Sequence, residues 1–419
     1  MKMILSLNKV SLLTSLIILL LSVAPLHGAS NFHPYTIKLK NSLHSERYDE
    51  RVMVPLSDLK NHIKDFDENN CVIKLNGKNI PFDLVKDNYN KVNLVFQLNF
   101  KPDELKLVTL SYSAKKPVFH NNRTRAYLGV KKNYAVKEGV YTGGNFESTD
   151  HAVVPKSHFP HDALYQMEGP AWESDKVAYR FYLDERNRTD IFGKSTNKMV
   201  LDIVGKNDLL SGDESYEYPL WWGQDIFKVG TSLGIGSVAS FMNDKVCTVS
   251  ETDSIRCAVF NYNVHSSVVS DHIGWKVDNN KFNISINYSI YPGSRLTEVN
   301  VKTDKPIENL CTGLAKHDST STLFSKNNDG WNYVAIWGKQ TICNDNLGIV
   351  LFYNSKDLIK LTEDKISQIV LLKPLGNCVK YFFAAAWEKE KNGVKTQKSF
   401  LQFLNSTIEA LNNPIIVAL

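Results

Sequence analysis

The residues best suited to chemistry gather in one segment of this chain, from His151 to Lys194. The segment contains three of the 11 histidines, with aromatic, acidic and arginine side chains and little apolar sequence between them. Such groups are costly to bury without partners, and binding or catalytic clefts bring them together. The segment therefore predicts a functional cleft.

Within it, Val177 to Asp184 has the pattern of a strand whose side chains alternate between two faces. The apolar face carries Val177, Tyr179, Phe181 and Leu183, and the other face carries Ala178, Arg180, Tyr182 and Asp184. An arginine, a tyrosine and an aspartate on one face can bind a carboxylate, donate a proton and hold a hydroxyl group. A solvated face with an ion pair is the alternative interpretation.

The flanking residues favour the functional interpretation. Tyr165 and Trp172 offer flat apolar surfaces of the kind on which sugar rings stack, and Glu168 and Glu173 offer acceptors for hydroxyl groups. They predict an aromatic and acidic wall beside the strand.

His158 and His161 lie three residues apart with Pro160 between them, so they are expected in a loop. Two close histidines suggest a metal pair with Asp162 as an adjacent ligand, or a catalytic base or acid with its orienting partner. No third ligand follows at a metal-binding spacing. Solvent exposure of both side chains without a function is the remaining interpretation.

The second half of the chain holds fewer candidates. Trp221 and Trp222 are adjacent, so in a strand they point to opposite faces and at most one lines a given cleft. Arg295 is a candidate for binding, and His317 at an expected strand end is a candidate for catalysis. His272 is an isolated histidine expected to be structural. No nucleotide-binding fingerprint, GxSxG, HExxH or phosphate-binding loop is present.

The first elements that could support this cleft are short strands. Asn76-Gly77, between the apolar runs Cys71 to Leu75 and Ile80 to Leu84, is the dipeptide best suited to a tight hairpin turn. Apolar and polar residues alternate from Val92 to Phe100, which buries one face of a strand.

We interpret residues 30–113 as a small N-terminal β-sandwich and the polar stretch 114–150 as a linker. From residue 151 to 419 the alternation continues in longer strands such as Phe282 to Ile290, with a helix expected around Phe400 to Leu411. Many long strands require two large packed antiparallel sheets, so the predicted fold is mainly β, with a β-supersandwich as the catalytic domain.

Residues 1–29 have the pattern of a secretory signal peptide, with Lys2 and Lys9 ahead of an apolar run. No other stretch approaches the roughly 20 apolar residues of a membrane span. Without these two lysines the formal net charge falls from +5 to +3, which suggests no nucleic-acid partner. Six cysteines permit disulfides in an oxidising compartment, and a Cys247 to Cys257 bridge across a hairpin is one arrangement.

The run HDALYQMEGPAWESDKVAYRFYLDERNRTDIFGK, followed by WWGQDIFKVGTSLGIGS and GLAKHD, resembles a family of exported proteins of bacterial polysaccharide-utilisation loci. One branch of that family acts as an oligosaccharide dehydratase in the degradation of ulvan, a sulfated algal polysaccharide rich in uronic acid and rhamnose. The resemblance covers most of the mature chain. It implies a periplasmic enzyme that eliminates water from a uronic acid at the non-reducing end of an oligosaccharide, giving a 4,5-unsaturated uronyl end. The expected sheets are also similar to the supersandwich of mutarotase-like and lyase proteins.

Such an elimination needs a group that neutralises the carboxylate, a base for the C5 proton and an acid for the departing hydroxide. Arg180 is the expected neutraliser. The base is expected to be His158 or His161, with His317 in reserve, and the acid Tyr165, Tyr182 or Glu173. The expected binding residues are Glu168, Trp172, Asp184, Trp222 and Arg295. No cofactor is expected, and a divalent cation held by Asp162 and the histidines is the alternative to Arg180.

Three other functions remain open from the sequence. A polysaccharide lyase would use the same base and neutraliser but cleave the glycan chain. A non-catalytic glycan-binding protein would use Trp172, Trp221 or Trp222 as stacking platforms. A mutarotase or epimerase would form no unsaturated product.

Overall fold

The computed structural model describes residues 34–113, 115, 117–206, 216, 218–325 and 329–419. The predicted signal peptide, residues 1–29, lies outside the described residues. Within them, no helix is long and apolar enough to cross a membrane. The predicted mainly-β class is confirmed, because antiparallel sheets account for most of the ordered structure.

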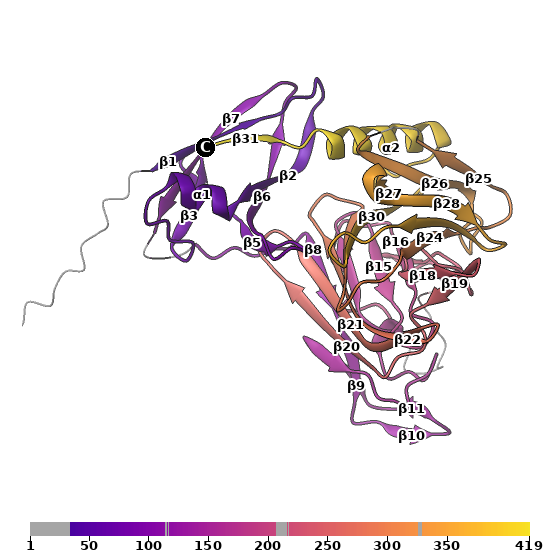
Figure 1. Ribbon diagram of the computed structural model, residues 1–419. Coiled ribbons are helices and arrows are strands. Elements are labelled where there is room, and N and C mark those ends of the chain that lie inside the picture. Colours follow the sequence, from indigo (N-terminus) through magenta and orange to yellow (C-terminus); the bar gives the residue numbers. More distant parts are fainter. Residues whose placement is uncertain (1–33, 114, 116, 207–215, 217, 326–328) are drawn as a thin grey trace, which may run out of the picture.

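Two antiparallel sheets form the N-terminal domain (Figure 1), in the strand orders β31-β1-β7-β3-β4 and β2-β6-β5. Their elements are β1 (Tyr35–Lys40), β2 (Arg47–Pro55), α1 (Leu56–His62), β3 (Cys71–Leu75), β4 (Lys78–Ile80), β5 (Asp83–Lys86), β6 (Val92–Phe100), β7 (Leu105–Tyr112) and β31 (Ile416–Ala418). Asn76 and Gly77 have φ of 50° and 77° in the β3–β4 turn, which confirms the predicted hairpin.

The last strand, β31, returns the chain to this domain and pairs with β1, with Ala418 opposite Lys38. Figure 1 shows it running from the end of α2 (Gln397–Asn412) to the N-terminal sheet. The N-terminal domain therefore contains residues from both ends of the chain, which a division at residue 113 does not capture.

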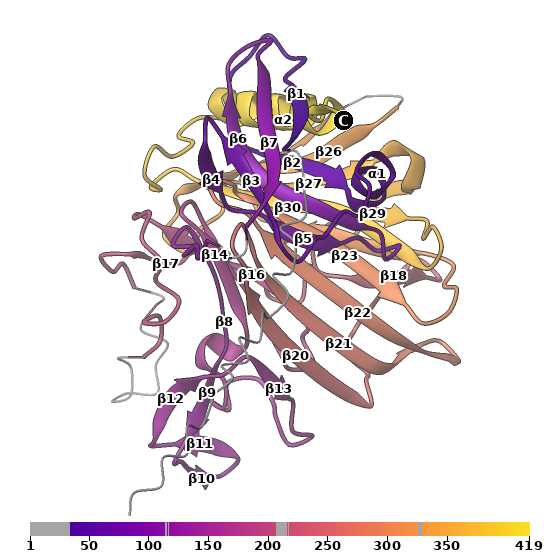
Figure 2. The ribbon, with the colours of Figure 1, turned by 90° about the vertical axis from the view of Figure 1, so that its left-hand side faces the viewer.

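The large domain is built on a nine-stranded sheet, seen broadside in Figure 2, with the order β13-β20-β21-β22-β23-β30-β27-β26-β25. Its strands are β13 (His151–Val153), β20 (Ser254–Asn261), β21 (Ser266–Val277), β22 (Asn280–Ile290), β23 (Leu296–Thr303), β25 (Thr320–Phe324), β26 (Trp331–Lys339), β27 (Asn346–Asn354) and β30 (Cys378–Trp387).

Two five-stranded sheets share one apolar core with the nine-stranded sheet. The first, which we call the site sheet, has the order β17-β16-β15-β14-β8 and consists of β8 (Thr124–Tyr127), β14 (Ala171–Ser174), β15 (Ala178–Phe181), β16 (Thr189–Lys194) and β17 (Gly223–Asp225). The second has the order β19-β18-β24-β29-β28 and consists of β18 (Ala239–Met242), β19 (Lys245–Thr248), β24 (Leu310–Ala315), β28 (Leu358–Glu363) and β29 (Ser367–Leu372).

The stretch 114–150 is more ordered than its polar composition suggests. It supplies β8, which pairs with β14 at the edge of the site sheet. It also supplies two small pairs of strands, β9 (Gly129–Lys132) with β12 (Asn145–Ser148) and β10 (Ala135–Lys137) with β11 (Val140–Thr142). β10 and most of β12 are exposed, which explains why this sequence resembles a linker.

Cys247 and Cys257 are both free thiols. Cys247 lies in β19 and Cys257 in β20, which belong to different sheets. The hairpin bridge considered from the sequence is therefore wrong, because the two residues do not face each other across one turn.

The helix α2 covers the outer face of the nine-stranded sheet through Phe400, Leu404 and Ile408. A capping box starts it, because the Thr396 side chain accepts from the Ser399 amide at 3.1 Å and the Ser399 side chain accepts from the Thr396 amide at 3.1 Å.

Thr396→Ala should remove this cap and lower the free energy of unfolding by about 1 kcal/mol in urea titrations. Lys398→Ala, an exposed change in the same helix, should stay within about 0.5 kcal/mol of the parent.

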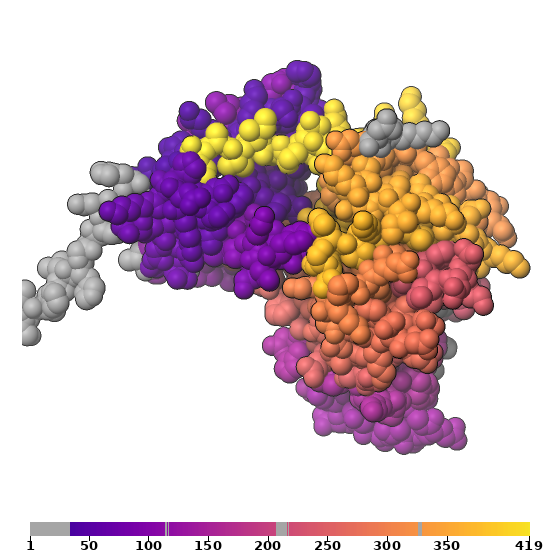
Figure 3. Space-filling model, in the orientation of Figure 1, coloured from indigo at the N-terminus to yellow at the C-terminus, as the bar shows by residue number. Residues whose placement is uncertain are grey.

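Charged pairs join the two domains, which lie against each other in Figure 3. Arg51 of β2 pairs with Glu298 of β23 at 2.6 Å, and Glu298 also meets Lys380 of β30 at 3.1 Å. Arg123 donates hydrogen bonds to both carboxylate oxygens of Asp49, at 2.7 and 2.8 Å. These contacts fix the N-terminal domain beside the large domain.

Candidate active site

The outer face of the site sheet carries the strand that the sequence singles out. In β15, Tyr179 and Phe181 belong to the core shared with the nine-stranded sheet, whereas Ala178 belongs to the cluster on the opposite face. Arg180 lies on that opposite face as well, with its guanidinium 5.0 Å from the Phe192 ring centroid. The predicted alternation is confirmed within β15, but the strand ends at Phe181, so Tyr182 and Asp184 of the predicted strand lie in the connection to β16.

Arg180 lies between two aspartates. Strand register places Asp190 of β16 opposite Arg180, and Asp225 ends β17 beside them. Nη2 of Arg180 is 2.7 Å from Asp190 Oδ2 and 2.5 Å from Asp225 Oδ2. Nη1 donates to the Tyr216 hydroxyl at 3.1 Å. All four side chains are buried, so two aspartates already compensate the charge of Arg180.

Tyr182 completes this buried group. Its hydroxyl donates to Asp190 Oδ2 at 2.5 Å and accepts from Arg180 Nη2 at 3.1 Å. Burial raises the pKa of Tyr182 well above its ordinary value, and the Asp190 carboxylate acts in the same direction. The phenol therefore keeps its proton at neutral pH, poised between a cation and a carboxylate.

The group reaches solvent through Arg186, Glu168 and His161. Arg186 donates to Asp184 at 2.6 and 2.9 Å, pairs with Glu168, and lies 4.0 Å from the Tyr182 ring centroid. His161 Nδ1 is 3.2 Å from Glu168 Oε1. Side-chain exposure rises from 7% at Glu168 through 24% at Arg186 to 64% at His161, which marks the mouth of the site.

The loop that carries His161 and Glu168 is held in an unusual backbone conformation. His161, Ala163, Met167 and Glu168 have φ between 59° and 63°, a left-handed region that side chains disfavour. Each such residue costs about 1–3 kcal/mol and is retained where the surrounding structure imposes it, most often at functional sites. The strained loop supports the assignment of this region as a site.

His158 is engaged elsewhere in the same loop. Its Nδ1 lies 2.7 Å from Asp162 Oδ2, with side-chain exposures of 3% and 1%, and its ring meets Tyr165 edge-on. Asp162 also accepts from the Leu164 amide at 2.9 Å. Burial raises the pKa of Tyr165. Because the side chains of His158 and Asp162 are buried against each other, His161 is the more accessible of the two histidines.

Glu173 and Lys194 form a buried ion pair on the same face as Arg180. Lys194 Nζ lies 2.5 Å from Glu173 Oε2, and Glu173 Oε1 accepts from the amides of Val200 and Leu201 at 2.7 and 3.0 Å. Both side chains have no exposed surface. These contacts fit a support for the adjoining loop better than the acid that the sequence suggested.

The tryptophans expected to bind sugar are interior residues. Trp172 is fully buried, stacks on Tyr288 with centroids 4.8 Å apart, and donates to Thr297 at 2.8 Å. Trp222 is 2% exposed and packs on Phe192, whereas Trp221 is 61% exposed. Trp221 and Trp222 differ in exposure as expected, although they lie in a turn and not in a strand, and neither Trp172 nor Trp222 offers a free face for stacking.

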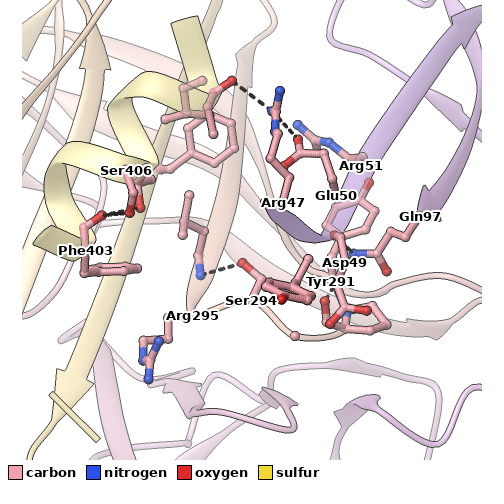
Figure 4. Close-up of a pocket in the computed structure, with 18 of the residues that line it drawn as sticks. Arg47, Asp49, Glu50, Arg51, Gln97, Tyr291, Ser294, Arg295, Phe403 and Ser406 are labelled. Carbon is pink, nitrogen blue, oxygen red and sulfur yellow. Dashed lines mark hydrogen bonds and ion pairs between the residues drawn. The ribbon is translucent and has the colours of Figure 1, made fainter. Parts of the chain in front are cut away.

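Arg295 lies away from this group, in a cavity of about 480 Å³ between the N-terminal domain, the β22–β23 turn and α2. Figure 4 shows it beside Phe403 of that helix, and its guanidinium is 5.6 Å from the Phe403 ring centroid. Its Nε is 3.0 Å from both carboxylate oxygens of Glu390. Arg295 therefore does not join Arg180 in one site.

His317 follows β24 and meets Phe227 edge-on, with ring centroids 5.2 Å apart. Phe227 comes two residues after Asp225 in the sequence. Burial lowers the pKa of His317, and Lys228 lowers it further. Its neutral, basic form is therefore favoured, which keeps it as the reserve base.

His272 of β21 lies beside Asn187, which belongs to the turn between β15 and β16. Its Nε2 lies 2.9 Å from Ser270 Oγ and its Nδ1 lies 3.4 Å from Asn187 Nδ2, and Asn187 also donates to the Val249 carbonyl at 2.6 Å. The histidine is completely buried. Burial lowers its pKa from 6.5 to about 3.

This lowered pKa predicts a pH dependence of stability. Between pH 6.5 and about 3 the unfolded chain binds a proton at His272 that the native protein does not, so the free energy of unfolding should fall as the pH falls through this window. Urea titrations at pH 7 and pH 5 should show this decrease, and His272→Gln should reduce it. An equal pH dependence in the variant would rule out His272 as a cause.

Several residues in or near the buried group were not predicted as site residues from the sequence: Arg186, Arg188, Asp190, Tyr216 and Asp225. Asp190 could have been found by pairing Val177–Asp184 with the residues after the turn, because that hairpin brings Asp190 opposite Arg180. Asp225 and Tyr216 arrive from a distant segment, and no local pattern marks them.

Among the described residues, no group of three or more His, Cys, Asp or Glu side chains is arranged to hold a metal ion. The carboxylates described above are instead paired with arginine, lysine or histidine.

Comparisons with known proteins give a family but no described activity. The chain is similar to the structure of an alpha-mannosidase from Enterococcus faecalis V583, at 9% identity and a TM-score of 0.45 over 92% of this chain and 46% of that one. It is also similar to a protein in the Glycosyl Hydrolase Family 38 from Enterococcus faecalis, at 9% identity and a TM-score of 0.44 over 92% and 47% of the two chains. The chain thus spans about half the length of these proteins. No curated protein matches the sequence. The profile of a domain of unknown function, DUF4861, matches residues 39–417, so the chain belongs to the DUF4861 family.

Proposed function

We propose that the protein is an oligosaccharide dehydratase that removes water from a uronic acid at the non-reducing end of ulvan-type oligosaccharides. The observation that carries this proposal is the Tyr182 hydroxyl, held between Arg180 and Asp190 in a site whose mouth holds the His161–Glu168 pair. An elimination needs an acid and a base in one site, and these residues supply both. The resemblance to the ulvan dehydratase family supports the choice of substrate.

His161 is the proposed base. Its Nδ1 faces Glu168, which orients the ring and would stabilise the imidazolium formed on proton uptake. The imidazole of His161 would take the C5 proton of the uronate. The exposure of this side chain allows a sugar to reach it, in contrast to the buried His158.

Tyr182 is the proposed acid. The C5–H bond and the C4–O bond break, the C4–C5 double bond forms, and the departing hydroxide takes the phenolic proton to leave as water. Arg180, 3.1 Å from the Tyr182 oxygen, would stabilise the tyrosinate that remains. Arg180 thus acts as a positioning residue, because Asp190 and Asp225 already occupy its donors.

Positive and negative side chains both occur in the site. Arg180 and Arg186 are already paired with carboxylates, and a third arginine, Arg188, lies on the same hairpin. The C5 proton becomes more acidic as the adjoining carboxylate is neutralised, so a nearby arginine promotes the elimination.

The reaction is tested with a purified uronate-ended oligosaccharide. Ultraviolet absorbance and chain length are followed together, because a dehydratase and a lyase both form an unsaturated uronate but only a lyase shortens the chain. Increased absorbance with an unchanged number of sugar units would support the proposal. Cleavage into two fragments would favour a lyase, and binding without absorbance would favour a glycan-binding protein.

We also propose that residues 1–29 direct export to the periplasm before they are removed. The supporting pattern is the pair of lysines followed by an apolar run. N-terminal sequencing of protein from the periplasmic fraction should begin close to residue 30, and recovery of the full-length chain from the cytoplasm would contradict the proposal.

A further inference from the structure

The hairpin formed by β15 and β16 carries three arginines, Arg180, Arg186 and Arg188, and Arg188 differs from the other two in its partners. The Tyr182 amide donates to the Arg188 carbonyl at 2.9 Å, one position beyond the last strand pair, Phe181 with Thr189, so the backbones of the two residues lie opposite each other. Arg188 is 7% exposed. A cation this deeply buried normally requires a counter-ion.

Backbone carbonyls, and not carboxylates, hold Arg188 in place. Nε donates to the Ser232 carbonyl at 2.5 Å, and Nη1 donates to the Arg186 carbonyl. Two of the five guanidinium N–H groups are thereby used, and their carbonyl acceptors fix the plane of the group. Within the described ranges, no carboxylate forms an ion pair with Arg188, and Nη2 donates to no protein group.

The two neighbouring arginines, in contrast to Arg188, are paired with carboxylates. Arg180 is bound by Asp190 and Asp225, and Arg186 by Asp184 and Glu168. An anion that approached either would compete with carboxylates already in place. Burial also lowers the pKa of Arg188 to about 10, with Asp184 acting in the opposite direction, so the group remains cationic at neutral pH but lacks full compensation.

We propose that Arg188 is the receptor for the substrate's carboxylate, which it binds through the donors that the protein leaves unused. This inference rests on the proposed function and replaces Arg180, the neutraliser expected from the sequence, with a residue whose charge is available. A planar guanidinium can bind a carboxylate through two parallel hydrogen bonds, and the buried setting strengthens that contact. Bound beside Tyr182, the carboxylate would lie next to the proposed acid, where the uronate C4 and C5 must react.

The test varies the side chain at position 188 and, separately, the charge of the ligand. Binding of a glucuronate-ended disaccharide and of its neutral methyl ester is measured by calorimetry on the wild type, Arg188→Met and Arg188→Lys. The wild type should bind the acid about 10- to 100-fold more tightly than the ester, the range expected for hydrogen bonds to a charged group. Arg188→Met should bind both equally weakly, and Arg188→Lys should recover part of the preference because it keeps the charge without the planar fork.

Arg256→Met removes one exposed positive charge from β20 and should keep the full preference for the acid. If the wild type binds acid and ester equally, the inference fails without reference to any variant, so misfolding of Arg188→Met cannot hide that result. An undiminished preference in a folded Arg188→Met would also overturn it. Arg188-dependent binding of the acid with no unsaturated product would instead refute the dehydratase and leave the receptor in place.

Discussion

Replacing Arg180 with methionine is expected to lower the free energy of unfolding by about 3–5 kcal/mol, because the change leaves Asp190 and Asp225 buried without their cation. The hydroxyl of Tyr182 would also lose its donor from Arg180. Chemical denaturation of the purified variant measures the loss. Activity should fall together with stability, since the acid is no longer positioned.

The stability loss comes from the uncompensated carboxylates, so removing their charge should reverse it. The triple variant Arg180→Met, Asp190→Asn, Asp225→Asn should recover most of the unfolding free energy, because replacing a whole buried ion network by neutral groups is often nearly neutral. It should stay inactive, since the tyrosinate oxygen would have lost the guanidinium that donates to it. A stable and active triple variant would refute the role given to Arg180 in positioning the acid.

Replacing His161 with asparagine is expected to lower kcat by about 10²- to 10⁴-fold, the contribution typical of a positioned general base. Asparagine tolerates the left-handed backbone found at this position, where φ is 63°, so the change should not disturb the loop. Because the side chain is 64% exposed, the unfolding free energy should change by no more than about 0.5 kcal/mol. Initial rates and thermal unfolding of the same preparation separate the two effects.

His151 provides the matched control for this variant. It is an exposed histidine of the neighbouring strand β13, paired with Asp150 at 2.5 Å, and it has no part in the site group. His151→Asn should leave the rate unchanged. If His161→Asn is as active as His151→Asn, His161 is not the base, and the same comparison with a substitution at His317 would then test the reserve candidate.

Local patterns in the sequence were sufficient for much of the fold. The alternation in Val92–Phe100 and in Phe282–Ile290 corresponds to β6 and to most of β22, and the Asn76-Gly77 turn lies where expected. These features depend on residues within one strand or one hairpin. The helix near the C-terminus was predicted for the same reason, since its apolar residues recur at helical spacing.

The site was only partly predictable, because its burial depends on distant segments. Arg180 and Tyr182 were placed on the correct face, but nothing local indicates that Asp225 would reach Arg180 across 45 positions. Trp172 was read as a sugar platform, yet the nine-stranded sheet covers it through Tyr288. Whether a side chain packs in a core or lines a cleft is decided by the sheet opposite, which alternation along one strand does not reveal.

We propose above all that the protein removes water from a uronate end and leaves the chain whole. Mass spectrometry of a purified uronate-ended oligosaccharide, incubated with wild-type protein and in parallel with His161→Asn, tests it most directly. The wild type should yield one product that is lighter than the substrate by one water and has every sugar unit retained, and the variant should yield far less of it in the same time. Two shorter fragments, or an unchanged substrate with the wild type, would contradict the claim.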